Sequence, residues 1–147
     1  MTDDRILARL TYHETRPWAP TTRKAKVLRI MASHTHMSLG MVEPGFGAVC
    51  VPVVLAGVRL PNARSKSLVE KTLSKMIRAE LRRLVENRVV HVNTLANQDK
   101  YGRFVARISV SEIGDLSLYL LDKGVVVEET TKNPEWDSIL KQVFAKR

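Results

Sequence analysis

The sequence has few of the residues that cross-link or anchor a protein. It contains one cysteine, Cys50, among 147 residues, which excludes an intrachain disulfide and fits a reducing compartment. The longest apolar run, Ala48–Val58, is interrupted by Pro52 and is too short to span a bilayer. No targeting segment is evident, because Met1–Asp4 is acidic and no apolar stretch follows it. We therefore expect a soluble cytoplasmic protein that does not enter a membrane.

Aromatic and acidic residues are also scarce. Aromatics make up 5% of the composition, which leaves few platforms on which the bases of a single strand could stack. Between Arg5 and Glu70 the only acids are Glu14 and Glu43. Basic residues dominate, with 24 Lys and Arg against 15 Asp and Glu, a net charge of +9 and a pI near 10.1. A field of this sign favours association with polyanions.

The positive charge is concentrated between Arg64 and Arg88, where eight Lys or Arg accompany three Glu. The same segment predicts a helix over Ser67–Asn87 that begins with a capping box of Ser67 and Glu70. Its apolar residues recur at helical spacing and form one buried stripe: Val69, Leu73, Met76, Ile77, Leu81, Leu84 and Val85. Its cations line a single exposed face: Lys71, Lys75, Arg78 and Arg82. This face is either solvated or binds a polyanion.

The rest of the chain predicts a small β-rich domain. Alternating patterns predict strands at Lys24–Ala32, Thr35–Val42, Ala48–Leu60, Val89–Leu95 and Phe104–Val110. Two more helices are expected, at Asp115–Lys123 before Gly124 and from Asn133-Pro134 onward, the latter with Trp136, Ile139, Leu140 and Val143 facing inward. Three strands, a helix and two strands follow the order of an OB-type barrel. We expect an α+β, mainly β fold: a five-stranded OB-type barrel with three packed helices over residues 23–147, preceded by an N-terminal arm over residues 1–22.

The turn Asp99-Lys100-Tyr101-Gly102-Arg103 presents two cations and an aromatic ring just before a strand. Gly102 can take positive φ at little steric cost, which favours a tight turn. The turn, the strand after it and the segment Gly114–Val125 together resemble the C-terminal half of the staphylococcal nuclease (thermonuclease) family. The resemblance extends over residues 24–146 and implies the family's OB-type barrel. It leaves open whether the turn is retained for structure or for binding phosphate.

The resemblance also implies calcium-dependent cleavage of phosphodiesters by carboxylates, a general-base glutamate and two arginines. Carried over residue by residue, the two metal carboxylates fall on His34 and Arg59, the general base on Asn62 and the first phosphate arginine on Val54. Only the second phosphate arginine is retained, as Arg103. A calcium site needs several anionic oxygens. We therefore expect a degenerate member of the family, with no metal, no cofactor and no nuclease activity.

Three functions remain open. The first is noncatalytic binding of nucleic acid or another polyanion by Arg59, Lys100, Tyr101, Arg103 and the face of Lys71, Lys75, Arg78 and Arg82. The second is a protein-interaction adaptor that binds an acidic protein surface. The third is a nuclease with a rebuilt site on His34, His36 and Arg103. The two histidines could also share a metal with His91 or Cys50, but two ligands without a fixed third are weak evidence, and we interpret them as ordinary polar residues.

Overall fold

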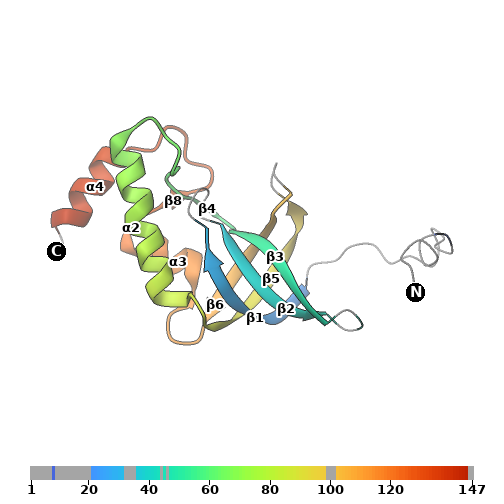
Figure 1. Cartoon of the computed structure of the whole chain (residues 1–147). Helices are drawn as coiled ribbons and strands as arrows, with labels where there is room; N and C mark the ends of the chain where they lie inside the picture. The colour runs from blue at the N-terminus through green and yellow to red at the C-terminus, as the bar shows by residue number, and fades with distance from the viewer. Residues whose placement is uncertain are drawn as a thin grey trace.

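The computed structural model describes residue 8 and residues 21–31, 36–43, 45, 47–98 and 102–145. Its centre is one sheet with the strand order β3-β2-β1-β5-β6-β7, in which β3 also pairs with β6. The strands are β1 (Thr21–Ile30), β2 (Met37–Glu43), β3 (Gly47–Leu55), β5 (Val89–Gln98), β6 (Phe104–Val110) and β7 (Gly114–Asp115). The β3–β6 pairing is parallel and closes five strands into a barrel. The predicted OB-type barrel is confirmed (Figure 1).

The barrel closes around alternating apolar side chains. Buried residues recur at every second position of β2 and β6, as in Met37, Leu39 and Met41. In β1 the register against β2 shifts between Val27 and Arg29. This irregularity moves the next buried residue to Ile30, so that Leu28 and Arg29 both lie outside the core.

The third predicted strand is shorter than expected. The sequence predicted one strand over Ala48–Leu60, but β3 ends at Leu55 and a turn at Ala56-Gly57 precedes the two-residue β4 (Val58–Arg59). Gly57 has φ 78°, a conformation that other residues rarely adopt. The break lets β4 leave the barrel and pair with β8 (Val127–Glu128). A glycine inside an apolar run therefore marked a turn.

Helix α2 (Leu68–Val85) confirms the strongest helix prediction. Ser67 is its N-cap, and the Ser67 hydroxyl accepts a hydrogen bond from the Glu70 amide at 3.3 Å. Its C-terminal end is tied to β1, because the Asn87 amide donates to the Val27 carbonyl at 2.7 Å. The buried stripe includes Ser74, which the sequence pattern did not identify.

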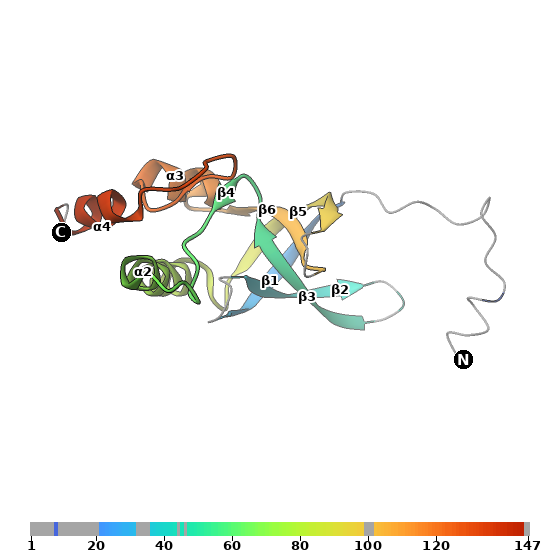
Figure 2. The same ribbon diagram turned by 90° about the horizontal axis from the view of Figure 1, so that it is seen from above.

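Two more helices gather beside α2 on one side of the barrel (Figures 1 and 2). Helix α3 (Leu116–Lys123) begins one residue later than predicted, with Asp115 as its N-cap, and Gly124 is its C-cap, as predicted. Helix α4 begins later than predicted, at Trp136, and runs to Ala145. Asn133 has φ 50°, whereas an N-cap residue needs an extended conformation. None of the helices in the described part of the chain is both long and apolar enough to cross a membrane.

Candidate functional site

The first three turns of α2 carry a cluster of cations around a small hollow. Lys71, Lys75 and Arg78 line this hollow of about 140 Å³ together with the buried Ser74 and with Ala63 from the preceding loop. The cations come together because residues three and four apart share one side of a helix. Three of the four cations predicted to share a face therefore surround one concave surface. Arg82, the fourth, does not line it.

The cations near α2 fall into two groups by their ion pairs. At the C-terminal end, Arg82 pairs with Glu86 at 3.4 Å, Arg83 pairs with Glu80, and Arg88 lies 3.7 Å from Glu112. At the N-terminal end no cation has an acidic partner within 4.0 Å in the part of the chain that the structure describes. These are Arg64, Lys66, Lys71, Lys75 and Arg78, which we call the N-terminal cation group. Among the described residues, the cations without an acidic partner thus run from the loop before α2 to Arg78, just past the middle of the helix.

The only carboxylate in the first turn of α2 is used to hold the loop before it. The Glu70 carboxylate accepts a hydrogen bond from the backbone amide of Asn62 at 3.2 Å. The Asn62 side chain in turn accepts one from the Arg64 amide at 2.8 Å. Only one of the two hydrogen bonds of the predicted capping box is present. The Ser67 hydroxyl accepts from the Glu70 backbone amide, but the Glu70 carboxylate binds the loop and not the Ser67 backbone amide. Sequence reasoning missed this contact, because Asn62 and Glu70 are separated by a loop of unknown path.

Arg59 occupies the position that the resemblance assigned to a metal carboxylate. It lies on β4, and its guanidinium donates to the Thr131 carbonyl at 3.1 Å. It thereby links β4 to the segment that follows β8. Val54, at the position of the first phosphate arginine, lies on β3 opposite Val105. Neither Arg59 nor Val54 carries a carboxylate.

Arg103 lies beside the start of β2. Its guanidinium is 3.1 Å from the His36 Nδ1 atom, in a half-buried position. Arginine only donates, so this contact requires a histidine ring whose Nδ1 carries no proton. The structure thus brings together two members of the hypothetical rebuilt site. Lys100, Tyr101 and His34 lie outside the described residues.

At the positions that the resemblance assigns to metal binding and catalysis, the described residues carry no carboxylate that could bind a calcium ion. Arg59 is a cation, Val54 is apolar, and the side-chain oxygen of Asn62 already accepts a hydrogen bond. Calcium requires six to eight oxygen ligands, several of them anionic. Over residues 21–31, 36–43, 47–98 and 102–145, no group of three or more His, Cys, Asp or Glu is placed to hold a metal. His91 and Cys50 are both exposed and belong to no such group.

The comparison with known families agrees with the barrel and its helices. The family model of the staphylococcal nuclease homologues matches residues 52–146, from β3 to the end of α4. Strands β1 and β2 lie outside the matched segment. No curated protein matches the chain. Since the match covers well over half of the residues and the fold is the same barrel, the chain belongs to the staphylococcal nuclease homologue family.

Proposed function

We propose that this nuclease-family domain binds nucleic acid or another polyanion and does not cleave it. The observation that carries the proposal is the N-terminal cation group of α2: five Lys or Arg without an acidic partner in the described part of the chain, three of them around one hollow. The phosphate groups along a nucleic-acid backbone could each pair with a cation of this group.

The position of these cations costs stability, which supports a role in binding. Lys66 and Lys71 lie near the N-terminus of α2 and oppose the helix macrodipole, whose positive end lies there and whose effect fades within about one turn. Like charges at i, i+4, such as Lys71 and Lys75, also repel each other. A bound phosphate would relieve both effects, because the helix N-terminus and the cations attract the same anion. Arg78 would add a planar fork that can bind two phosphate oxygens.

The proposed absence of cleavage is supported by the side chains at the positions that the resemblance assigns to catalysis. Arg59 would repel a divalent cation, and Asn62 cannot act as a carboxylate base. In the proposed function Arg59, Lys100, Tyr101 and Arg103 also contribute to phosphate binding. None of these residues needs a metal to bind an anion.

Fluorescence anisotropy with labelled 20-nucleotide single-stranded RNA, single-stranded DNA and duplex DNA tests the proposal. The key variant is the triple substitution Lys71→Gln, Lys75→Gln and Arg78→Gln. The matched control is Arg82→Gln, Arg83→Gln and Arg88→Gln, which removes the same charge from cations that are already paired. We expect the key variant to lower the log–log salt slope for duplex DNA by about 2 to 3, because each lost phosphate contact contributes about 0.9. The control should change the slope by less than about 1.

Four results would contradict the proposal. No binding at 50 mM salt would exclude a polyanion-binding role, and binding only to an acidic protein would favour the adaptor. Equal loss in both triple variants would show that net charge alone is responsible. Cleavage in the presence of calcium, or cleavage that disappears in His34→Ala, would show that a catalytic site remains.

A further inference from the structure

A second cavity lies on the opposite face of α2, between α2, α3 and α4. It has a volume of about 400 Å³, within the range of small-molecule sites. Its lining from α2 includes Leu73, Ile77 and Glu80. Because successive helical residues are rotated by about 100°, these three point away from Lys71, Lys75 and Arg78. The cavity is therefore independent of the proposed polyanion surface.

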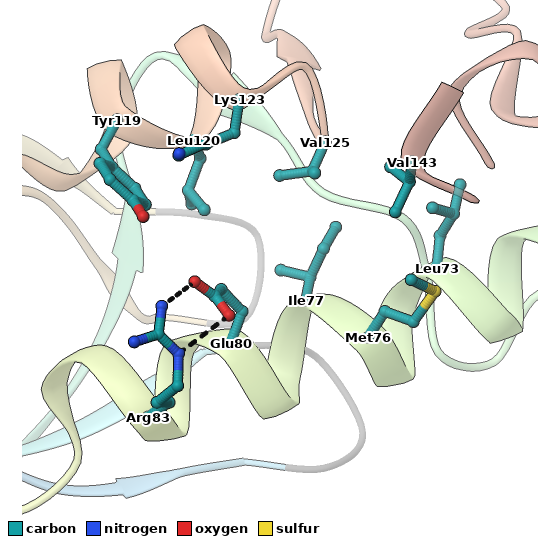
Figure 3. A pocket seen from close by; sticks show the side chains of 10 residues that line it. All are labelled: Leu73, Met76, Ile77, Glu80, Arg83, Tyr119, Leu120, Lys123, Val125 and Val143. Carbon is teal, nitrogen blue, oxygen red and sulfur yellow. Dashed lines mark hydrogen bonds and ion pairs between the residues drawn. The ribbon is translucent and has the colours of Figure 1, made fainter. Parts of the chain in front are cut away.

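The two ends of this cavity differ in polarity. Figure 3 shows Leu73, Met76 and Val143 grouped at one end, with Val125 and Ile77 next to them. At the other end lie the polar side chains Glu80, Arg83, Tyr119 and Lys123. Met76, Val125 and Val143 are only half-buried, so the helices do not fill the apolar end by themselves. A ligand with an apolar body would remove this surface from water.

The polar end carries a net positive charge. Arg83 and Glu80 form an ion pair, and the Glu80 carboxylate raises the pKa of the Arg83 guanidinium through hydrogen bonding and charge, with a smaller contribution from Tyr119. These two charges therefore cancel. The Lys123 ammonium lies over the Tyr119 ring, 5.4 Å from its centre, and has no acidic partner within 4.0 Å in the described ranges. The remaining positive charge and the hydrogen-bond donors favour an anionic head group.

We propose that this cavity binds a small organic anion whose apolar body lies against Met76, Val125 and Val143 and whose carboxylate or similar head group faces Lys123. The segregation of apolar and cationic side chains sets both the class of ligand and its orientation. Because Arg83 is paired with Glu80, Lys123 is the main positive charge available to the head group of the ligand. This site does not depend on nucleic-acid binding.

Phenylbutyrate and phenylbutylamine are suitable probes, because they share an apolar body and carry head groups of opposite charge. Binding to the full chain is measured by titration of amide chemical shifts. We expect phenylbutyrate to bind at least about tenfold more tightly than the amine at low salt. The largest shifts should fall on Leu73–Arg83, Tyr119 and Val143. Phenylbutylamine binding as tightly as phenylbutyrate, or shifts elsewhere, would overturn the proposal.

Two variants with a matched control complete the test. Lys123→Glu reverses the charge of the exposed rim and should reverse the preference between the two probes. Lys75→Glu makes the same change on the opposite face of α2 and should leave both affinities within about twofold. Val143→Trp fills the apolar end and should abolish binding of both probes in a protein that still melts cooperatively. The proposal is wrong if Lys75→Glu reduces phenylbutyrate binding as much as Lys123→Glu does.

Discussion

The two halves of α2 use similar residues for different purposes. The part of α2 that follows Arg78 contributes Leu81, Leu84 and Val85 to the main core cluster, and its cations Arg82 and Arg83 are paired. The N-terminal half contributes Leu73 and Ser74 to the buried surface, but neither belongs to that cluster, and its cations have no acidic partner in the described chain. The comparison shows that the effect of a charge on a helix depends on its partners. One end of α2 forms ion pairs within the domain, and we propose that the other end binds an external anion.

The two ends of α2 also differ in how they are joined to the barrel. Glu86 accepts a hydrogen bond from the buried Ile30 amide at 3.2 Å and also pairs with Arg82. Val27 exchanges two backbone hydrogen bonds with the residues that follow the helix, Asn87 and Arg88. The N-terminal end has no comparable link to the barrel among the described residues. Its side-chain hydrogen bonds are local: Glu70 accepts from the backbone amide of Asn62, and the Asn62 side chain accepts from the backbone amide of Arg64.

The largest expected effect is the loss of core packing at the C-terminal half. Leu81 is 0% exposed, and Leu81→Ala should lower the free energy of unfolding by about 2 to 5 kcal/mol, since it leaves a cavity. Lys75→Ala, at the other end, should change it by less than about 0.5 kcal/mol. Urea denaturation of both variants measures the difference. Similar losses in both would contradict the division of α2 into two halves.

A smaller effect is expected at the junction itself. Glu86→Ala removes the partner of the buried Ile30 amide and should cost about 1 to 2 kcal/mol. Glu112→Ala is the control, because Glu112 is 77% exposed and its pair with Arg88 should contribute less than about 0.5 kcal/mol. Thermal melts measure the two effects, and we expect a larger fall in the melting temperature for Glu86→Ala. Equal falls in the two variants would show that the contact between Glu86 and Ile30 does not stabilise the domain.

The loop before α2 should affect both stability and binding. Asn62→Ala removes the acceptor of the Arg64 amide and should cost about 1 kcal/mol. Because the same loop carries Arg64 and borders the hollow at Ala63, the affinity for duplex DNA should also fall by a few-fold, while Glu112→Ala should leave it unchanged. Anisotropy measured at constant salt distinguishes the two. Unchanged affinity in Asn62→Ala would show that the loop plays no part in binding.

The smallest effect is expected at Arg59. Its bond to the Thr131 carbonyl is exposed, so Arg59→Gln should lower the free energy of unfolding by about 0.5 kcal/mol or less. We also expect calcium to leave the melting temperature of the wild-type chain unchanged. A ligand raises the melting temperature only if it binds the folded state better than the unfolded state, and we expect no such difference for calcium. A calcium-dependent rise of several degrees, lost or altered in Arg59→Gln, would contradict the interpretation of the family's metal positions.

Much of the fold could be predicted from the sequence because its signals are local. Ser67, Asp115 and Gly124 mark helix ends through their own backbone and side-chain chemistry, and the structure uses all three. The break at Gly57 and the late start of α4 were missed, because both depend on where β8 and the helices pack. The spacing of Lys71, Lys75 and Arg78 predicted a shared face, but the ion pairs of Arg82, Arg83 and Arg88 depend on side-chain geometry. The cavity beneath α3 and α4 gave no sequence signal, since its lining comes from three separate helices.

Mapping of amide chemical shifts during titration with duplex DNA tests the central claim most directly. The account predicts shifts that are concentrated between Ala63 and Arg78 and that fade with added salt, with small changes from Leu81 to Arg88. Shifts concentrated on the paired C-terminal cations would contradict it. So would binding that leaves the amides around Lys71 and Lys75 unchanged.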